Sequence, residues 1–255
     1  MIRAAFFDID GTLLSFRTHR VSPGTLRAIG RLRRQGVLVF ISTGRPKVLI
    51  PELPFPTDGL ITMNGALVLG PEGETLLSNP VPQTDTEAWL DYAAAHGLCT
   101  MLFTADGMIA SQLNPAALAI RDQLDFAMPP VVDIDRLRGT LAYQIIALMP
   151  ESMDAALAPL LPHSRLPRWH PQFTDIVAAG NSKALGMEAL CRHFGIDRRD
   201  TIAFGDGAND IEMLHYAGTG IAMGNAADCV KEAADLVTAD VDHEGIEQAV
   251  NQLLP

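Results

Sequence analysis

The segment IRAAFFDIDGT, residues 2–12, contains an apolar run that ends in two acidic residues. Residues 2–9 have the near-continuous hydrophobic character of a strand that is buried on both faces of a parallel sheet. Asp8 and Asp10 place two carboxylates where this strand ends and the chain turns at Gly11. Ligands of open parallel sheets bind beyond the carboxyl ends of the strands, so we predict that this turn belongs to a functional site.

The flanking sequence alternates between apolar strand patterns and helical patterns. Ser22 and Pro23 are typical of a helix N-cap and first turn, and Gly36 is typical of the residue that follows a helix end. Strands separated by single helices predict a doubly wound, Rossmann-like parallel sheet with right-handed crossovers. The strands expected in this core are residues 2–9, 37–42, 60–63, 201–205, 220–223 and 236–238, and the later helices are residues 181–195, 208–216, 226–233 and 242–254.

Residues 80–178 have a different pattern, with paired strands between the helices. Two apolar runs, residues 100–104 and 108–111, flank the turn sequence Ala105-Asp106-Gly107, which predicts a hairpin. Such pairing favours an antiparallel α+β module. Further strands are expected at residues 143–149, 165–169 and 173–177, and helices at residues 84–96, 115–124 and 153–160. We therefore predict an α/β fold in which a core of residues 1–79 and 179–255 carries an inserted α+β cap domain, residues 80–178.

Composition excludes several classes of protein. Asp and Glu outnumber Lys and Arg by 30 to 19, giving a formal net charge of −11, and such a surface repels nucleic acid and anionic lipid. The 3 cysteines have no CxxC spacing, which argues against a zinc site or a disulfide framework. No run approaches the ~20 apolar residues of a membrane span, and Asp8 and Asp10 interrupt the apolar core that we would expect of a signal peptide. We expect a cytoplasmic protein with neither nucleic-acid nor membrane partners.

The acidic pair indicates metal-assisted chemistry. Carboxylates at positions i and i+2 of a turning strand end reach the same small volume, where like charges raise one another's pKa unless a cation lies between them. Mg²⁺ prefers oxygen ligands and keeps coordination positions open for phosphate. Asp8 is then a candidate nucleophile toward phosphorus, and Asp10 a candidate general acid and base. The alternative is a solvated Asp-Gly turn without chemistry.

A second acidic cluster, GDGAND at residues 205–210, lies between a predicted strand and a predicted helix. Asp206 is placed as a second direct metal ligand, and Asp210 is placed one helical turn further on. A helix cap is the structural alternative, although a cap needs only one acid. A dinucleotide-binding motif is excluded because Asp210 stands where the third glycine of GxGxxG is required.

Three further residues would serve a phosphate group. Thr43 and Gly44 follow the second predicted strand and offer a hydroxyl and an exposed backbone N–H. Lys183 opens the helix after the inserted module and supplies a fixed positive charge. Together with Mg²⁺ these donors would stabilise the charge that develops in phosphoryl transfer.

Taken in chain order, DIDGT (8–12), STGR (42–45), Asn64-Gly65, Lys183 and GDGAND (205–210) resemble the motifs of the haloacid dehalogenase-like superfamily. Within it the chain resembles the Cof-type phosphatases, whose α/β cap is inserted between the second and third motifs. The resemblance covers essentially the whole chain, and the motifs in this order are highly specific. One departure is Ala184, where the family often has glycine.

The resemblance implies a role for each matching residue. Asp8 would be the nucleophile and Asp10 the general acid and base of a Mg²⁺-dependent phosphatase that passes through a phospho-aspartate. The implied metal ligands are Asp8, Asp10 through its backbone carbonyl, Asp206 and Asp210. The implied phosphate- or substrate-binding residues are Thr43, Gly44, Arg45, Asn64, Lys183 and Asn209.

The implied substrate is a small phosphorylated metabolite of the sugar phosphate, pyridoxal phosphate or flavin mononucleotide class. Candidate readers of the leaving group are His170, Gln172 and Asp175, for which the alternative is polar loop residues. Trp169 and Phe173 are expected in the core of the cap rather than as a stacking platform. Both a monomer and a homodimer remain open.

Other functions stay as alternatives. A phosphosugar mutase of the same superfamily needs a second phosphate pocket, for which Arg165 and Arg168 are candidates. A signalling receiver domain also uses a phospho-accepting aspartate, but Asp10 and the inserted module argue against it. A non-catalytic protein that binds phosphorylated ligands is the third alternative.

Overall fold

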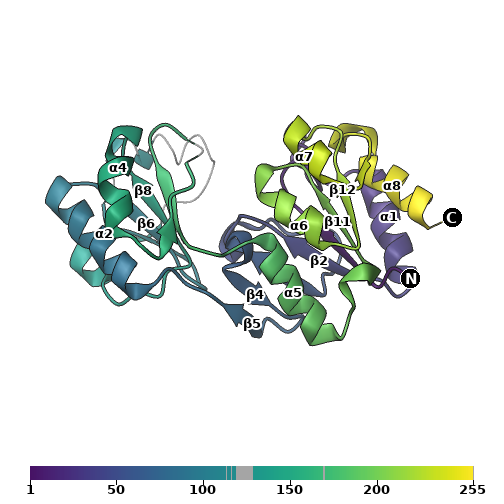
Figure 1. Ribbon diagram of the computed structural model, residues 1–255, viewed down its shortest axis with the longest axis horizontal. Helices are drawn as coiled ribbons and strands as arrows, with labels where there is room; N and C mark the ends of the chain where they lie inside the picture. Colours follow the sequence, from purple (N-terminus) through teal and green to yellow (C-terminus); the bar gives the residue numbers. More distant parts are fainter. Residues whose placement is uncertain (113, 116, 119–128, 169, 255) are drawn as a thin grey trace. The chain divides into compact units, whose positions relative to one another are not determined.

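The computed structural model describes residues 1–112, 114–115, 117–118, 129–168 and 170–254. The expected helix at residues 115–124 therefore lies mostly outside the described residues, and Trp169 lies outside them entirely. The chain forms two compact units (Figure 1). One unit comprises Met1–Gly44, Pro51–Ser78 and Ser182–Pro255, and the other comprises Arg45–Ile50 and Asn79–Asn181.

The first unit is built on an eight-stranded sheet with the order β13-β12-β11-β1-β2-β3-β4-β5. Its first six strands in this order are parallel, which confirms the predicted doubly wound core. The strands are β1 (Ala4–Phe7), β2 (Leu38–Ser42), β3 (Gly59–Thr62), β4 (Leu67–Leu69), β5 (Thr75–Ser78), β11 (Thr201–Gly205), β12 (Thr219–Ala222) and β13 (Leu236–Val237).

Strands β4 and β5 form an antiparallel extension that the sequence analysis did not anticipate. The β4–β5 turn closes with a 3.0 Å hydrogen bond from Gly73 N to Gly70 O. Gly73 has φ +83°, a conformation that glycine adopts without strain. Strand β4 has 3 residues and β5 has 4, so neither gives a strong strand pattern in the sequence.

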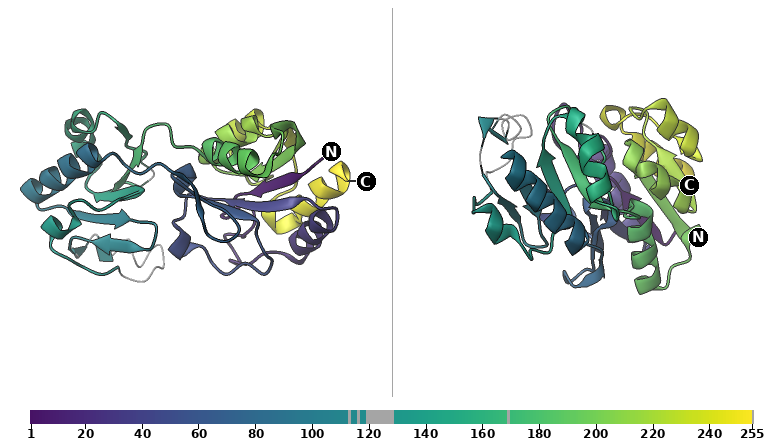
Figure 2. Two further views of the ribbon diagram at one scale, coloured as in Figure 1. Left: turned by 90° about the horizontal axis from the view of Figure 1, so that it is seen from below. Right: turned by 60° about the vertical axis from the view of Figure 1, so that its left-hand side comes forward.

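Helices cover both faces of this sheet. In the left panel of Figure 2 the strands lie between α5 and α6 on one side and α1 and α8 on the other. Ser22 caps α1, its Oγ accepting a hydrogen bond from Thr25 N at 3.1 Å, and Gly36 follows the helix with φ +78°, as predicted. The helices are α1 (Pro23–Arg34), α5 (Lys183–Phe194), α6 (Ile211–Tyr216), α7 (Asp228–Ala233) and α8 (Gly245–Leu253).

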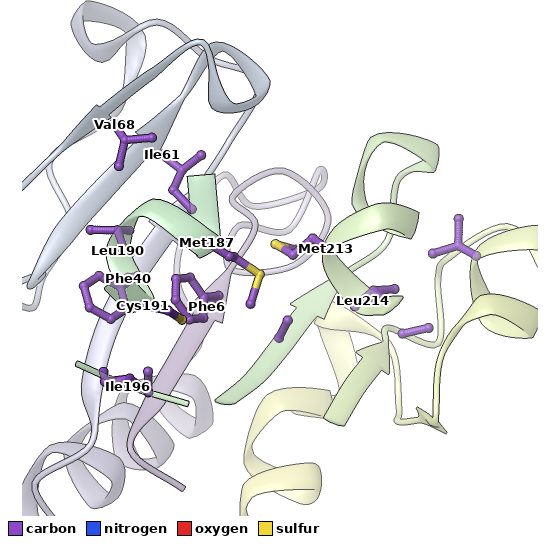
Figure 3. Close-up of a cluster of buried hydrophobic side chains, with 14 of the residues drawn as sticks. Phe6, Phe40, Ile61, Val68, Met187, Leu190, Cys191, Ile196, Met213 and Leu214 are labelled. Carbon is purple, nitrogen blue, oxygen red and sulfur yellow. The ribbon is translucent and has the colours of Figure 1, made fainter. Parts of the chain in front are cut away.

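Apolar side chains of α5 and α6 pack on one face of the sheet (Figure 3). Phe6 of β1 and Phe40 of β2 stack with their ring centroids 4.8 Å apart, and Met187 and Leu190 of α5 belong to the same fully buried cluster. Burial of each such side chain contributes roughly 1.5–3 kcal/mol. This core fixes the helix that begins at Lys183 against the strands that end near Asp8.

The second unit contains an antiparallel sheet with the order β7-β6-β8-β10-β9. Helix α2 (Gln83–His96) packs on it through Trp89, whose Nε1 donates a 2.7 Å hydrogen bond to Thr100 Oγ1. Among the described residues, none of the helices is long and apolar enough to cross a membrane. The remaining elements are β6 (Cys99–Phe103), β7 (Met108–Ala110), β8 (Gln144–Leu148), α4 (Asp154–Leu157), β9 (Ser164–Arg165) and β10 (Thr174–Ala178).

Two expected elements of this unit are shorter than predicted. The helix expected at residues 153–160 has only one α-helical turn, α4, between two 3₁₀ turns. Pro159 lies in the second of these turns and has no N–H with which to continue the helix. The strand expected at residues 165–169 ends at Arg165, two residues before Pro167.

Candidate active site

Parallel pairing brings three strand ends to the same level. Phe7 of β1 pairs with Ile41 of β2 and with Phe204 of β11. Asp8 N donates a 3.0 Å hydrogen bond to Phe204 O, so the Asp8 side chain emerges where the sheet ends. Thr43 and Asp206 each follow the last residue of a neighbouring strand. The strand register therefore places Asp8, Thr43 and Asp206 at the same edge of the sheet, as the sequence predicted for each of them.

Helix α5 brings a positive charge into this edge. Ser182 caps the helix through a 3.2 Å hydrogen bond from Leu185 N to its Oγ. The next residue, Lys183, is fully buried, and its Nζ lies 2.5 Å from Oδ1 of Asp8 and 2.5 Å from Oδ1 of Asp210. Gly65 lets another loop approach closely, because a Cβ there would collide with the carbonyl oxygen of Ser182.

Three carboxylates form a compact group beside this lysine. Each of Asp8, Asp206 and Asp210 offers an oxygen, and these oxygens lie within 4.8 Å of one another. Asp210 Oδ2 accepts hydrogen bonds from the N–H groups of Asp206 at 3.0 Å and Gly207 at 2.9 Å. Thr12 Oγ1 donates to Asp206 Oδ1 at 2.9 Å. The group is therefore held in place by donors from its own loops.

Burial shifts the protonation of this group. Burial raises the pKa of Asp8 to about 8, against the opposing effect of the Lys183 ammonium. Burial also raises the pKa of Asp206 to about 6. Burial alone would lower the pKa of Lys183, but the carboxylates of Asp210 and Asp8 outweigh it and raise that pKa above its usual value. The lysine therefore stays charged, but one ammonium cannot neutralise the negative charge of three neighbouring carboxylates.

The donor set fits a hard divalent cation. Three carboxylate oxygens lie within 4.8 Å of one another, and two of them belong to groups with a raised pKa. A bound dication would relieve the repulsion between these carboxylates. Oxygen ligands of this kind suit Mg²⁺. The carboxylate of Asp10 does not belong to this group, and its implied metal ligand is instead the backbone carbonyl. Asp10 is half-buried and forms an isolated β-bridge with Leu14.

The turn after Asp8 depends on glycine. Gly11 has φ +83°, and a Cβ at this position would collide with Asp206 Oδ2 and lie 2.7 Å from the ring of Phe16. A side chain there would be strained by the backbone conformation and would displace the Asp206 carboxylate. Gly11 is thus required for the close approach of the first and last motifs.

The predicted phosphate-binding residues of the first unit also lie together. Thr43 is buried, and its carbonyl oxygen accepts a 3.0 Å hydrogen bond from Asn64 N. Asn64 adopts a left-handed conformation with φ +54°, and its Oδ1 accepts from Asn209 Nδ2 at 2.9 Å. A Cβ on Gly44 would lie 3.3 Å from the Asn64 amide. Arg45 instead belongs to the second unit, where its Nη1 donates to Leu49 O at 2.8 Å.

Arg168, a candidate for a second phosphate pocket, instead makes contacts that hold together parts of the second unit. Its guanidinium contacts both carboxylate oxygens of Asp154, at 2.7 and 2.5 Å, and donates to Phe173 O at 2.8 Å. Arg165 donates to Asn181 O at 2.5 Å. Arg168 is therefore held by contacts within the second unit, whereas Arg165 is exposed and donates to one backbone carbonyl.

The candidate readers of the leaving group differ in exposure. Asp175 is buried on β10, whereas Gln172 is exposed and donates its backbone N–H to His170 Nδ1 at 3.2 Å. The His170 ring stacks on Phe173, with centroids 4.8 Å apart, and Phe173 is fully buried. The expectation that Phe173 is a core residue is confirmed.

Sequence reasoning missed Asn225, which follows β12. Its Nδ2 donates to Gly11 O at 2.8 Å and to Asp206 Oδ2 at 3.2 Å. The available signal was its place: a polar residue one strand further along the same sheet edge, in the sequence MGNA. Asn225 lies outside GDGAND, the last of the motifs that point to the superfamily.

Comparison with known proteins identifies relatives over almost the full length. A family model described as haloacid dehalogenase-like hydrolase matches residues 5–250. YkrA of Bacillus subtilis (strain 168) is 34% identical over 252 residues, which cover 97% of this chain and 96% of YkrA.

Two solved structures have the same fold. BT1666 from Bacteroides thetaiotaomicron, a phosphatase of this superfamily, is 34% identical with a TM-score of 0.89, over 99% of this chain and 95% of that one. The subclass IIB sugar phosphatase BT4131 is 35% identical with a TM-score of 0.87, over 98% of each chain. These relatives confirm the predicted superfamily and the prediction of a phosphoric monoester hydrolase. The chain belongs to the haloacid dehalogenase-like hydrolase family.

Proposed function

We propose that this protein is a Mg²⁺-dependent phosphatase that releases phosphate from a small phosphorylated metabolite through a phospho-aspartate on Asp8. The observation that carries the proposal is the buried Lys183 ammonium 2.5 Å from both Asp8 and Asp210. Asp206 completes a carboxylate group around it. A helix cap or a solvated turn would not need three acids and a buried lysine in one place.

The residues divide the reaction into two balanced steps. In the first, an Asp8 carboxylate oxygen forms a bond to phosphorus while the bond to the leaving oxygen breaks, and Asp10 gives its proton to that oxygen. In the second, Asp10 takes a proton from water as the water oxygen attacks phosphorus and the bond to Asp8 breaks. Inorganic phosphate leaves, and both aspartates return to their starting states.

The remaining groups hold the phosphoryl oxygens. Lys183, the Thr43 hydroxyl and the Gly44 N–H are the proposed donors, with Asn209 held beside them by Asn64. Mg²⁺ would be held by Asp8, Asp206, Asp210 and the backbone carbonyl of Asp10, and when bound it supplies positive charge that favours the ionised form of Asp8 and offsets charge on the phosphoryl group. Arg45 and Asn64 stay proposed substrate contacts.

The proposal assigns the first unit to catalysis and the second unit to selection of the leaving group. The proposed division is a catalytic core of residues 1–79 and 179–255 and a cap of residues 80–178. The substrate class is a sugar phosphate or a similar phosphomonoester, which the sugar phosphatase BT4131 among the relatives supports. The cytoplasmic location and the choice between monomer and homodimer stay predictions from the sequence.

A direct test measures phosphate release from sugar phosphates, pyridoxal phosphate, flavin mononucleotide and p-nitrophenyl phosphate. Each compound is assayed with Mg²⁺ and with EDTA, for wild type and for Asp8→Asn, which removes the nucleophile with little change of volume. We expect turnover that requires Mg²⁺ and is lost in the variant. Equal turnover in EDTA, or full turnover in Asp8→Asn, would contradict the proposal.

A further inference from the structure

Asn225 lies in a loop that its neighbours hold closely. Met223 N donates to Gly205 O at 2.9 Å, and Gly224 N donates to Ala239 O at 3.1 Å. A Cβ on Gly224 would lie 2.6 Å from Asp240 N, so the two loops touch backbone to backbone. The side chain that follows is therefore presented from a fixed backbone position.

Each end of the Asn225 amide has a partner of matching kind. Nδ2 donates to Gly11 O and Asp206 Oδ2, while Oδ1 accepts a 3.0 Å hydrogen bond from Val241 N. A flipped amide would point its oxygen at two acceptors and its NH₂ group at a donor, so only one orientation satisfies the contacts. The amide thus connects the turn after Asp8, the Asp206 carboxylate and the loop before α8.

Asp206 is held at both of its carboxylate oxygens. Thr12 donates to Oδ1 at 2.9 Å, and Asn225 donates to Oδ2 at 3.2 Å. Two donors on different segments restrict rotation of the carboxylate and leave its other lone pairs for a cation. Thr12 comes from the same motif as the proposed nucleophile, whereas Asn225 comes from the loop after β12, on the far side of β11.

We propose that Asn225 is a positioning residue: it fixes the Asp206 carboxylate and, through the Gly11 carbonyl, the turn after Asp8 in the arrangement that binds a divalent cation. The inference rests on the proposed function, because it assigns Asp206 to that cation. Asn225 acts through Asp206 and touches neither the substrate nor the reacting atoms.

The exposure of Asn225 makes the proposal testable without loss of the fold. The residue is exposed, and its side chain fills no apolar core position, so Asn225→Ala leaves the packing of the sheet unchanged. Removing a group that orients a metal ligand weakens metal affinity by about 10- to 100-fold. Because Asn225 itself is exposed to water, we expect the low end of that range, about tenfold.

The experiment measures thermal unfolding across a titration of Mg²⁺ alone, without substrate. Binding to the folded state raises Tm, and the Mg²⁺ concentration that gives the rise reports affinity. Wild type, Asn225→Ala and Asn251→Ala are compared. Asn251 is a matched control, because it is an exposed asparagine whose amide accepts a hydrogen bond from Arg31 at 2.8 Å, outside the site.

We expect Asn225→Ala to need about tenfold more Mg²⁺ for the same rise in Tm, with Asn251→Ala matching wild type. The Tm of Asn225→Ala in EDTA should fall modestly, because the hydrogen bonds of the amide with Gly11 O and Val241 N are also lost. A lower Tm in EDTA with an unchanged Mg²⁺ requirement would mean that Asn225 only fastens the loop, and would overturn the inference. A wild-type Tm that does not respond to Mg²⁺ would overturn the proposed function and this inference together.

Discussion

Lys183 Nζ lies 2.5 Å from Oδ1 of Asp8, a residue 175 positions earlier in the chain. The first strand and the helix after the inserted segment thus meet in one buried ion pair. Asp210 shares the same ammonium at 2.5 Å, so one positive charge serves two carboxylates. In a chain with a net charge of −11, this lysine is the local positive centre that the proposed anionic substrate would require.

Replacing this lysine should affect both stability and catalysis. Lys183→Met keeps most of the side-chain volume but leaves the buried Asp210 carboxylate and the buried Asp8 carboxyl group without their partner. We expect the free energy of unfolding in EDTA to fall by about 3 kcal/mol, the cost of breaking a buried pair. The kcat for phosphate release should fall by about 10²–10³-fold. Urea unfolding and a phosphate assay check the two effects.

Lys231→Met is the matched control, since Lys231 lies half-buried on α7, outside the carboxylate group. It should change neither quantity. Wild-type stability and activity in Lys183→Met would contradict the role assigned to the ion pair.

Gly11→Ala should disable the site by displacing a carboxylate. The new Cβ would require a strained φ of +83° and would collide with Asp206 Oδ2. Misplacement of a catalytic group by 1 Å costs about 10²-fold in rate, and we expect a loss of kcat of this order.

Gly36→Ala provides the comparison for this variant. Gly36 has a similar φ of +78°, but a Cβ there would meet no atom within 4 Å. Both substitutions carry the conformational cost of about 1 kcal/mol, and only Gly11→Ala adds the collision. Equal kcat values for the two variants would show that the contact with Asp206 is unimportant.

The stability of the metal-free protein should fall between pH 6 and pH 8. The pKa of Asp8 is raised from 3.8 to about 8, so the folded state holds a proton that the unfolded chain has already lost. A raised carboxyl pKa means that stability decreases as pH rises from the unfolded pKa to the folded pKa. Asp206, with a pKa of about 6, contributes mainly below this window.

Thermal unfolding in EDTA at several pH values measures this dependence. Asp8→Asn removes the titrating group, so the difference between wild type and variant isolates Asp8 from the histidines. We expect wild type to lose stability relative to Asp8→Asn as pH rises, and saturating Mg²⁺ to reverse that loss. A difference that is flat from pH 6 to pH 8 would contradict the raised pKa.

Arg168 should behave as a structural residue of the second unit. Arg168→Lys loses the bidentate contact with Asp154, which we expect to cost about 1–3 kcal/mol in unfolding free energy. The KM for a sugar monophosphate should stay unchanged. Arg192→Lys, at an exposed ion pair with Glu188, is the control. Unchanged stability with a raised KM would instead favour the substrate-binding role that a mutase requires.

The sequence predicted the parallel core because each of its strands is a short apolar run between helices with recognisable ends. Strand β11 was predicted at its observed bounds, Thr201–Gly205, and α1 begins after its predicted cap, Ser22. The β4–β5 hairpin was missed because its strands are short and its second strand is only partly buried. Pro159 and Pro167 shortened two elements whose hydrophobic pattern alone suggested longer ones.

The sequence predicted those residues of the candidate site that directly follow the end of a strand. Asp8, Thr43 and Asp206 share one edge because parallel register places them there. The ion pair of Lys183 with two carboxylates could not be derived from spacing, since it depends on how α5 packs on the sheet. Arg168 was considered as a ligand because the sequence does not reveal its partner, Asp154.

The most direct measurement traps the proposed phospho-aspartate on Asp8. Enzyme mixed with substrate and Mg²⁺ is quenched during turnover and treated with sodium borohydride, which reduces an acyl phosphate to an alcohol. Peptide mass spectrometry then examines residue 8. The account predicts homoserine at position 8, dependent on substrate and on Mg²⁺. An unmodified Asp8 in samples quenched while phosphate is being released, or reduction at another carboxylate, would contradict it.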